Sequence, residues 1–219
     1  MGELYAVLTG DLVRSGGRSA AALGAAQAAL QGAAERLERA PWGEGAAPAG
    51  PLEIFRGDAW QLVLGGPRWA LRSALCLRAS LLASGHGDTR IAIGIDRIGR
   101  LDSERPSRST GPAFERSGRA LDTMPRRFRM TLDVDPARFP DARWQALAAH
   151  LCDAVVRRWR GRQAEAIRLA LLYPDDTHAA LAQRLRPAVS QQAVSKALAG
   201  AGWAALAELL AMLEAGAAE

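Results

Sequence analysis

The chain has 219 residues, enough for one large domain or for two small ones that each bury a core. Hydrophobic residues make up 49% of the sequence and aromatic residues only 5%, so the apolar side chains are mostly Ala and Leu, which favours helix. The formal net charge is +5, and Lys196 is the only lysine, so arginine carries nearly all of the positive charge. Such a charge permits an anionic partner, and it equally fits a solvated arginine-rich surface.

Neither secretion nor membrane insertion is expected from the sequence. No apolar run approaches the roughly 20 residues of a transmembrane helix, and the segment that starts at Met1 lacks the basic region and cleavage pattern of a signal peptide. Cys76 and Cys152 each fall in a helical apolar pattern without metal-ligand spacing, which predicts buried, reduced thiols. We therefore expect a cytoplasmic protein with no membrane partner.

The first part of the chain alternates between strand and helix patterns. An apolar run at residues 4–9 predicts a buried strand that is closed by a loop at Gly10 and Asp11. Two alternating segments that meet at Gly57 and Asp58 are typical of a β-hairpin. The predicted strands are 4–9, 52–56, 59–64, 90–95 and 128–134, the last an edge strand, and the predicted helices are 19–40, 68–84 and 111–124.

This order, β-α-β-β-α-β-α-β, predicts an α+β sandwich with helices packed on a mainly antiparallel sheet. Strand patterns stop near Pro136, and only helix patterns follow Pro140. The chain is accordingly divided into an α+β domain, residues 1–136, and an all-helical domain, residues 137–219. Helices are predicted at 141–160, 163–172, 177–185, 190–199 and 203–215.

Residues 174–205 have the pattern of a helix-turn-helix unit. Thr177 and Ser190 are placed to cap two successive helices, and Pro187 lies in the turn between them. Val194 and Leu198 can point back to the first helix, which leaves the polar side chains of the second helix facing outward. Gln can bond adenine in a bidentate way, and Lys can neutralise a phosphate. The predicted DNA-binding residues are Ser190, Gln191, Gln192, Ser195 and Lys196.

The segment SQQAVSKAL, residues 190–198, resembles the start of the recognition helix in a helix-turn-helix family, and residues 178–185 are similar to that family's first helix. The turn is about one residue longer than usual and carries Pro187 where Gly is customary. Two alternatives remain open: an ordinary helical hairpin with polar residues on its solvent side, and a helix-turn-helix unit that binds protein.

Asp11 and Asp58 form a candidate metal pair. Asp11 follows the first strand and Asp58 lies in the hairpin, so their carboxylates converge if these strands are neighbours. Paired Asp residues at strand ends suit Mg²⁺ beside a nucleotide phosphate, because hard cations prefer oxygen ligands. The alternative is ordinary turn chemistry, in which Asp is common.

Most of residues 3–134 resembles the SatD family and, more distantly, the class III nucleotide cyclases. The resemblance implies that Asp11 and Asp58 are metal ligands and that Arg119 is the catalytic arginine that steadies the transferring phosphate. An Asn expected four residues before that arginine is replaced by Glu115, and the residues that select the purine base have no clear counterpart. The segments that carry the resemblance are 9–15, 56–59, 90–95 and 111–121.

Arg116 and Arg119 fall on roughly one face of the predicted helix 111–124. They are candidates for binding nucleotide phosphates; alternatively, they form ion pairs with Glu115 and Asp122.

Taken together, these patterns predict a DNA-binding transcriptional regulator whose N-terminal domain senses a nucleotide ligand or mediates dimerisation. A homodimer on double-stranded DNA is expected, because one recognition helix reads too few base pairs, and the long helices between residues 141 and 172 are candidate dimer elements. The first alternative is a Mg²⁺-dependent nucleotidyl cyclase or nucleotidyltransferase that acts on nucleoside triphosphates through Asp11, Asp58 and Arg119. The second is an adaptor that binds other proteins.

Overall fold

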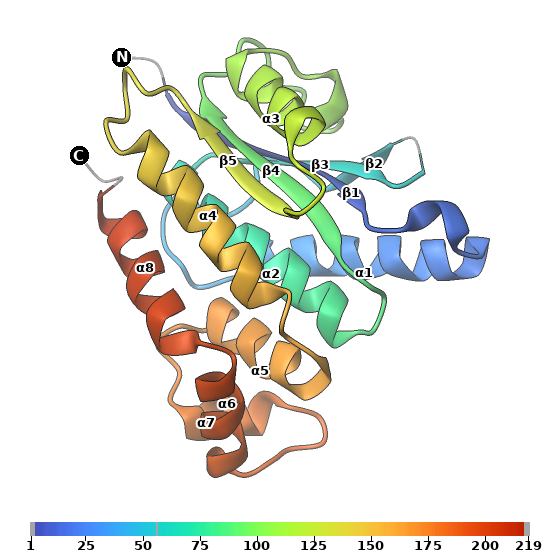
Figure 1. The fold of residues 1–219 in the computed structure, drawn as a ribbon, viewed down its shortest axis with the longest axis vertical. Helices are drawn as coiled ribbons and strands as arrows, with labels where there is room; N and C mark the ends of the chain where they lie inside the picture. Colours follow the sequence, from blue (N-terminus) through green and yellow to red (C-terminus); the bar gives the residue numbers. More distant parts are fainter. Residues whose placement is uncertain (1–2, 56, 217–219) are drawn as a thin grey trace.

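The computed structural model describes residues 3–55 and 57–216 and has an α+β fold, as predicted. Arg56, the predicted last residue of the first hairpin strand and a part of the SatD resemblance, lies outside the described residues, as do residues 1–2 and 217–219. One mixed sheet lies between a single helix on one face and a larger helical layer on the other (Figure 1).

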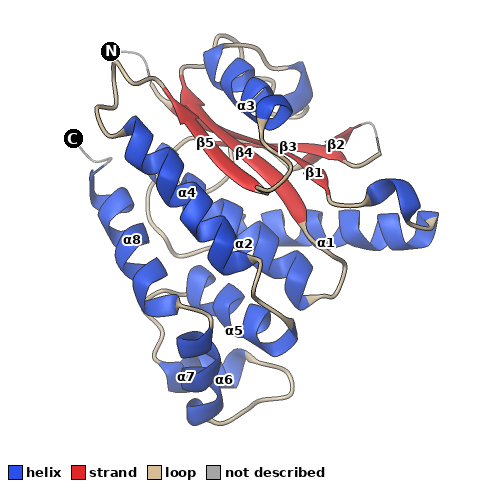
Figure 2. Cartoon of the chain, in the orientation of Figure 1, coloured by secondary structure: helices blue, strands red, loops and turns tan. Residues whose placement is uncertain are grey.

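Five strands form the sheet in the order β2-β3-β1-β4-β5 (Figure 2). All neighbouring strands are antiparallel except β4 and β5, which are parallel. The last strand lies at the sheet edge, as predicted. The strands are β1 (Tyr5–Leu12), β2 (Glu53–Phe55), β3 (Ala59–Leu64), β4 (Thr89–Asp96) and β5 (Met130–Val134).

Two corrections concern strand ends. β1 does not stop before Gly10 but runs on to Leu12, because Gly10 and Asp11 pair with both β3 and β4. Gly10 lies so close to the Trp60 ring and the Arg90 carbonyl that no Cβ would fit there. The glycine thus serves close packing within a strand rather than a loop. β5 begins two residues later than predicted, since the ring of Phe128 instead stacks on His150 with a centroid separation of 4.0 Å.

The segment from β1 to β4 has the split β-α-β arrangement of ferredoxin-like folds, in which β3 lies between β1 and β2 and is antiparallel to both. Two helices, α1 (Ala20–Glu38) and α2 (Ala70–Ala83), cover one face of the sheet and bury Leu30 and Leu75 against Leu8. Both helices follow from apolar residues at helical spacing, and Ser19 caps α1 by accepting a hydrogen bond from Ala22 N.

A third helix, α3 (Pro112–Thr123), covers the opposite face alone (Figure 1). Gly94 on β4 permits this close approach, because a Cβ there would collide with the backbone of Ala113 and Ser117. The hydroxyls of Thr9 and Ser117 are hydrogen-bonded at 2.8 Å across the interface.

The C-terminal helices are built onto α2 and β5. One buried cluster runs from the sheet through α2 into these helices, so the hydrophobic core is continuous across residue 136. Hydrogen bonds from two tryptophan side chains join distant segments of this core. Trp42 Nε1 donates to Leu172 O at 3.0 Å, and Trp159 Nε1 donates to Ala201 O at 3.0 Å. The helices are α4 (Ala142–Val156), α5 (Gly161–Leu172), α6 (His178–Arg184), α7 (Gln191–Gly200) and α8 (Trp203–Gly216).

The five predicted C-terminal helices are all present, but α4 ends at Val156 and not at residue 160. It ends early because Trp159 turns into the core, where it is fully buried. Cys76 and Cys152 are buried free thiols, as predicted, and burial raises the pKa of each to about 12.

Within residues 3–55 and 57–216, no single helix is both long and apolar enough to cross a bilayer, and the pair α7 and α8, which together reach the length, is bent by 72°.

Candidate functional site

The two candidate metal ligands lie at the same end of the sheet. Asp11 is opposite Ala59 in the β1–β3 register, and Leu12 N donates to Asp58 O at 3.1 Å, so the first strand ends beside the hairpin turn. Gly57 occupies this turn with a φ of 81°, a conformation that favours glycine. The strand order therefore places the two residues at the same end of the sheet, as expected from sequence.

Each carboxylate already has a partner. Arg90 Nη1 lies 3.1 Å from Asp11 Oδ2, and Arg90 Nη2 donates to Leu121 O at 2.8 Å, which links the pair to the end of α3. Ser15 Oγ donates to Asp58. Burial raises the pKa of Asp11 above its usual value, and nearby Asp58 adds to this although Arg90 acts in the opposite direction.

This donor set fits a divalent cation poorly. The Arg90 guanidinium supplies the positive charge that a metal ion would bring to Asp11, and Asp58 has the Ser15 hydroxyl. Within the described part of the chain, no three His, Cys, Asp or Glu side chains are placed to hold a metal ion. The geometry is that of a salt bridge beside a capped turn.

Arg116, a predicted nucleotide-binding residue, is surrounded by carboxylates. Its Nε lies 2.8 Å from Asp96, its Nη1 3.2 Å from Asp133 and its Nη2 3.9 Å from Asp135. The hydrogen bond to Asp96 raises the pKa of Arg116 further above its usual value, although partial burial opposes this. Arg116 thus fastens α3 to the ends of β4 and β5, and its surroundings repel an anion.

Arg119, the candidate catalytic arginine, lies one turn farther along α3. Its side chain is 63% exposed, and its Nη2 lies 3.8 Å from Asp133 Oδ2. Neither Arg116 nor Arg119 pairs with Glu115 or Asp122, so the predicted ion-pair partners are wrong, because the helix turns both arginines toward the sheet edge.

The acidic pair and Arg116 occupy opposite ends of the sheet. In the β1–β4 register Asp11 is opposite Arg90, whereas Asp96, the partner of Arg116, is opposite Tyr5. These positions are six residues apart on an extended strand, a separation of roughly 20 Å. The predicted metal pair and the predicted nucleotide-binding residue Arg116 thus lie too far apart along the sheet to meet in one site.

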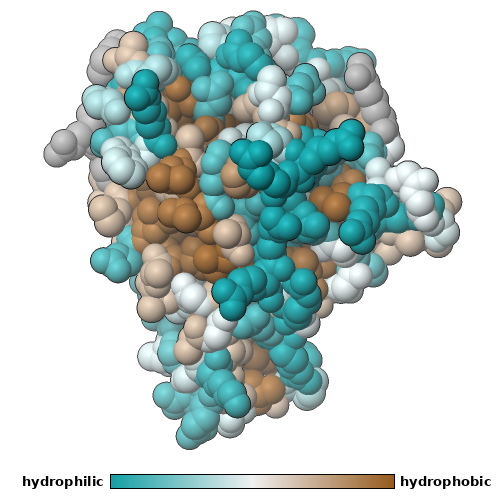
Figure 3. Space-filling model, viewed as in Figure 1, coloured by the Kyte–Doolittle hydropathy of each residue, from teal (hydrophilic) through white to brown (hydrophobic). Residues whose placement is uncertain are grey.

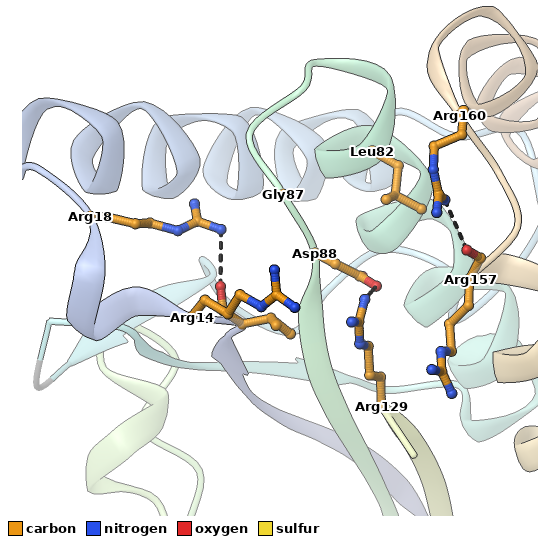
Figure 4. Close-up of a pocket in the computed structure, with 9 residues that line it drawn as sticks. Arg14, Arg18, Leu82, Gly87, Asp88, Arg129, Arg157 and Arg160 are labelled. Atoms are coloured by element: carbon orange, nitrogen blue, oxygen red, sulfur yellow. Dashed lines mark hydrogen bonds and ion pairs between the residues drawn. The ribbon is translucent and has the colours of Figure 1, made fainter. Parts of the chain in front are cut away.

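A pocket lined by arginines lies at the end of β1, on the side of the sheet that carries α2 and α4. Its volume is about 450 Å³, and four chain segments meet around it: the β1–α1 and α2–β4 turns, the start of β5 and the α4–α5 junction. Arg14 and Arg18 point toward Gly87 and Asp88 from the β1–α1 turn, and Arg129 reaches Asp88 from the other side (Figure 4). The arginines are Arg14, Arg18, Arg129, Arg157 and Arg160.

Behind this pocket is a buried ion cluster. Asp88 accepts two hydrogen bonds from Arg78, at 2.9 and 2.7 Å, and one from Arg129 at 2.8 Å. Asp153 on α4 accepts from Arg78 at 2.7 Å and from Arg129 N at 3.0 Å. Two carboxylates and two guanidinium groups therefore balance in charge, and Arg78 is fully buried between the sheet and α4.

Sequence reasoning missed this pocket. A signal was present in RRWRGR, residues 157–162, which places arginines on both sides of a buried tryptophan, and in Arg14 and Arg18 directly after the first strand. Arg14 is also the one non-glycine residue with positive φ in the described ranges, at 59°, and such backbone strain tends to concentrate at functional sites.

The predicted helix-turn-helix residues form α6, a turn and α7. Thr177 and Ser190 cap the two helices by accepting hydrogen bonds from Ala180 N and Ala193 N, as predicted. Val194 and Leu198 are buried, and both belong to the common core. The two helices lie at the end of the molecule farthest from the sheet (Figure 1).

Four of the five predicted DNA-binding residues are exposed on α7 or at its cap: Ser190, Gln191, Gln192 and Lys196. The fifth, Ser195, is half-buried, and its Oγ lies 2.8 Å from Nδ1 of His178 on α6. Its hydroxyl is therefore used to join the two helices.

Comparison of the chain with protein-family models, with curated proteins and with solved structures gave no match in any of the three.

Proposed function

We propose that this protein binds double-stranded DNA through α7 and acts as a transcriptional regulator. The observation that carries the proposal is the two-sided character of this helix: Val194 and Leu198 are buried, whereas Gln191, Gln192 and Lys196 are exposed at its N-terminal half. A recognition helix has this arrangement, because its first turns enter the major groove while its inner face packs on the preceding helix.

The exposed side chains suit both parts of DNA recognition. Glutamine amides can pair with the edge of adenine, and an ammonium group neutralises one phosphate. Arg186 in the preceding turn is exposed and is held in place by hydrogen bonds to Gln183 O and Leu185 O, so it supplies a second phosphate contact.

We further propose that the DNA-bound form is a homodimer that associates through α4 and α8. Trp144 is 70% exposed and Leu151 61% exposed, on one face of α4, and Met212 on α8 is 68% exposed. Apolar side chains gather over these helices on the face shown in Figure 3. A second copy would cover this surface and supply the second recognition helix that a useful operator length requires.

The SatD resemblance leads us to assign ligand sensing to the N-terminal part. A Mg²⁺-dependent cyclase is the weaker assignment, because Asp11 pairs with Arg90 and Arg119 pairs with Asp133 at a distance from it.

Selection of duplexes from a random pool tests the proposal. The wild-type chain is expected to enrich one sequence with two related half-sites about one helical turn apart, and Gln191→Ala with Gln192→Ala is expected to change or remove the preferred bases. A pool without enrichment after repeated rounds would contradict DNA recognition.

A further inference from the structure

The geometry points to a second binding site in the arginine-lined pocket, for a small polyphosphate anion such as a triphosphate group. This site is separate from α7, and the inference does not rest on DNA binding. It starts from the charge around the pocket.

Four of the five arginines have no carboxylate partner among the described residues. Asp88 is the single acid among the residues that line the pocket, and its carboxylate already pairs with both Arg78 and Arg129. In residues 3–55 and 57–216, the other four arginines lie in no salt bridge. They are Arg14, Arg18, Arg157 and Arg160.

Backbone carbonyls hold three of these guanidinium groups in place. Arg18 donates to His86 O at 2.7 Å and to Val13 O at 3.0 Å. Arg160 donates to Trp159 O at 2.6 Å and Arg157 to Arg127 O at 2.8 Å. A guanidinium has five N–H groups, so each keeps further donors for a ligand. Carbonyl oxygens orient these groups without cancelling their charge, and like charges gathered in this way favour a multiply charged anion.

The shape and lining of the pocket indicate the class of anion. A volume of about 450 Å³ is that of a small-molecule site, and the pocket is formed by four segments that surround it. Val13 and Leu82 are its apolar lining residues, and no aromatic ring lines it in the part of the chain that the structure describes. A phosphate chain therefore has many donors here, whereas a nucleobase would find no ring on which to stack.

A substitution of Arg14 can test ligand binding without lowering the stability of the fold. Its left-handed backbone, with φ 59° and ψ 41°, is one that glycine adopts without strain, and its side chain is exposed. Replacing Arg14 by glycine should therefore keep or raise the melting temperature and remove one charge from the pocket.

The test is calorimetric titration of the full chain with sodium triphosphate. Wild type is expected to bind, and R14G/R160A is expected to bind at least about tenfold more weakly because two charge-assisted contacts are lost. R39A/R143A removes the same charge from exposed positions outside the pocket and is expected to keep wild-type affinity. Circular dichroism melting of R14G alone checks that folding is intact.

Equal affinity for inorganic triphosphate and for ATP or GTP would show that phosphates alone are recognised, and tighter nucleotide binding would show an added base contact; both support the site. Three results would overturn it. The first is that wild type binds none of these anions. The second is that R14G/R160A binds them as well as wild type does while R14G is folded. The third is that R14G/R160A weakens the binding of duplex DNA only, which would place the DNA backbone in the pocket.

Discussion

The buried guanidinium of Arg78 shows how a single residue fixes the arrangement of distant segments. It donates to Asp88 on the α2–β4 turn and to Asp153 on α4, so one side chain from α2 joins segments that are far apart in sequence. Burial alone would raise the pKa of Asp88, but the hydrogen bonds from Arg78 and Arg129 outweigh it and hold this pKa below its usual value.

Asp88→Asn is expected to lower the free energy of unfolding by about 3–5 kcal/mol near neutral pH, because it leaves buried positive charge without its partner. Since the folded pKa of Asp88 is lowered, its stabilising contribution is present above the unfolded pKa of about 3.9 and is lost as pH falls through the folded value. Urea unfolding at neutral and acidic pH measures both effects.

The exposed Asp122→Asn serves as the control for this variant, and no change is expected from it at either pH. Two results would rule out this role of the ion cluster. Asp88→Asn lowers the free energy of unfolding no more than the control does at neutral pH, or its effect grows on acidification.

Ser195 is expected to act on stability more than on DNA contact. Ser195→Ala removes the hydrogen bond to His178 and should lower the free energy of unfolding by about 1 kcal/mol. Gln191→Ala, one turn earlier and exposed, should leave stability unchanged and weaken DNA binding. Thermal melts and DNA titrations of both variants separate the effect on stability from the effect on DNA binding. If Ser195→Ala weakened DNA binding and left stability unchanged, Ser195 would belong to the DNA-binding surface.

Residue-level prediction from sequence succeeded where the signal was local. Local spacing placed Thr177 and Ser190 as helix caps. The pairing of the first strand with the hairpin placed Asp11 and Asp58 at the same end of the sheet. Sequence reasoning did not find Arg78, whose partner Asp153 is 75 residues away and whose place in an apolar helix gives no sign of an ion pair. The arginine pocket was missed for the same reason.

At the scale of elements, sequence patterns predicted every α-helix and β-strand of the described fold, and the differences among these elements lie at their ends. β1 ran past Gly10 and α4 stopped before Trp159 because tertiary contacts, not local sequence, decided those ends. The apolar stripe on α4 is a further consequence of helical spacing, since Trp144, Leu147 and Leu151 fall on one exposed face.

Charge on this stripe should separate the protomers. Leu147→Glu with Leu151→Glu places like charges on both sides of the proposed interface and is expected to shift the chain from dimer to monomer in light scattering, with its helical content unchanged. Ala28→Glu with Gln31→Glu adds two acids at exposed positions of another helix, α1, and is the matched control. A wild-type chain that is monomeric at every concentration would contradict the interface.

At the scale of the whole molecule, the C-terminal helices complete the core of the sheet domain. α5 and α4 cover the outer side of α2, where Arg72 also donates to Leu171 O at 3.2 Å and pairs with Glu214 at 2.6 Å. The change from mixed to purely helical patterns near residue 136 was readable from sequence. The continuity of the core was not, since it depends on which helix faces meet.

Ending the chain after residue 136 should therefore expose the buried side of α2 and abolish cooperative folding. Circular dichroism melting and gel filtration of this fragment test the expectation. A soluble fragment with a sharp thermal transition would show that the sheet domain is independent of the helices.

The central claim, that α7 reads DNA, is tested most directly by fluorescence anisotropy with a selected duplex over a range of salt. We expect Gln191→Ala/Gln192→Ala/Lys196→Ala to weaken binding at least about tenfold and to reduce the slope of log affinity against log salt by about one, the share of one phosphate contact. Gln31→Ala on α1 with Arg39→Ala at its C-terminal cap removes an amide and a cation elsewhere, and this variant should bind as wild type does. Unchanged affinity in the α7 variant, or binding that does not respond to salt, would contradict the account.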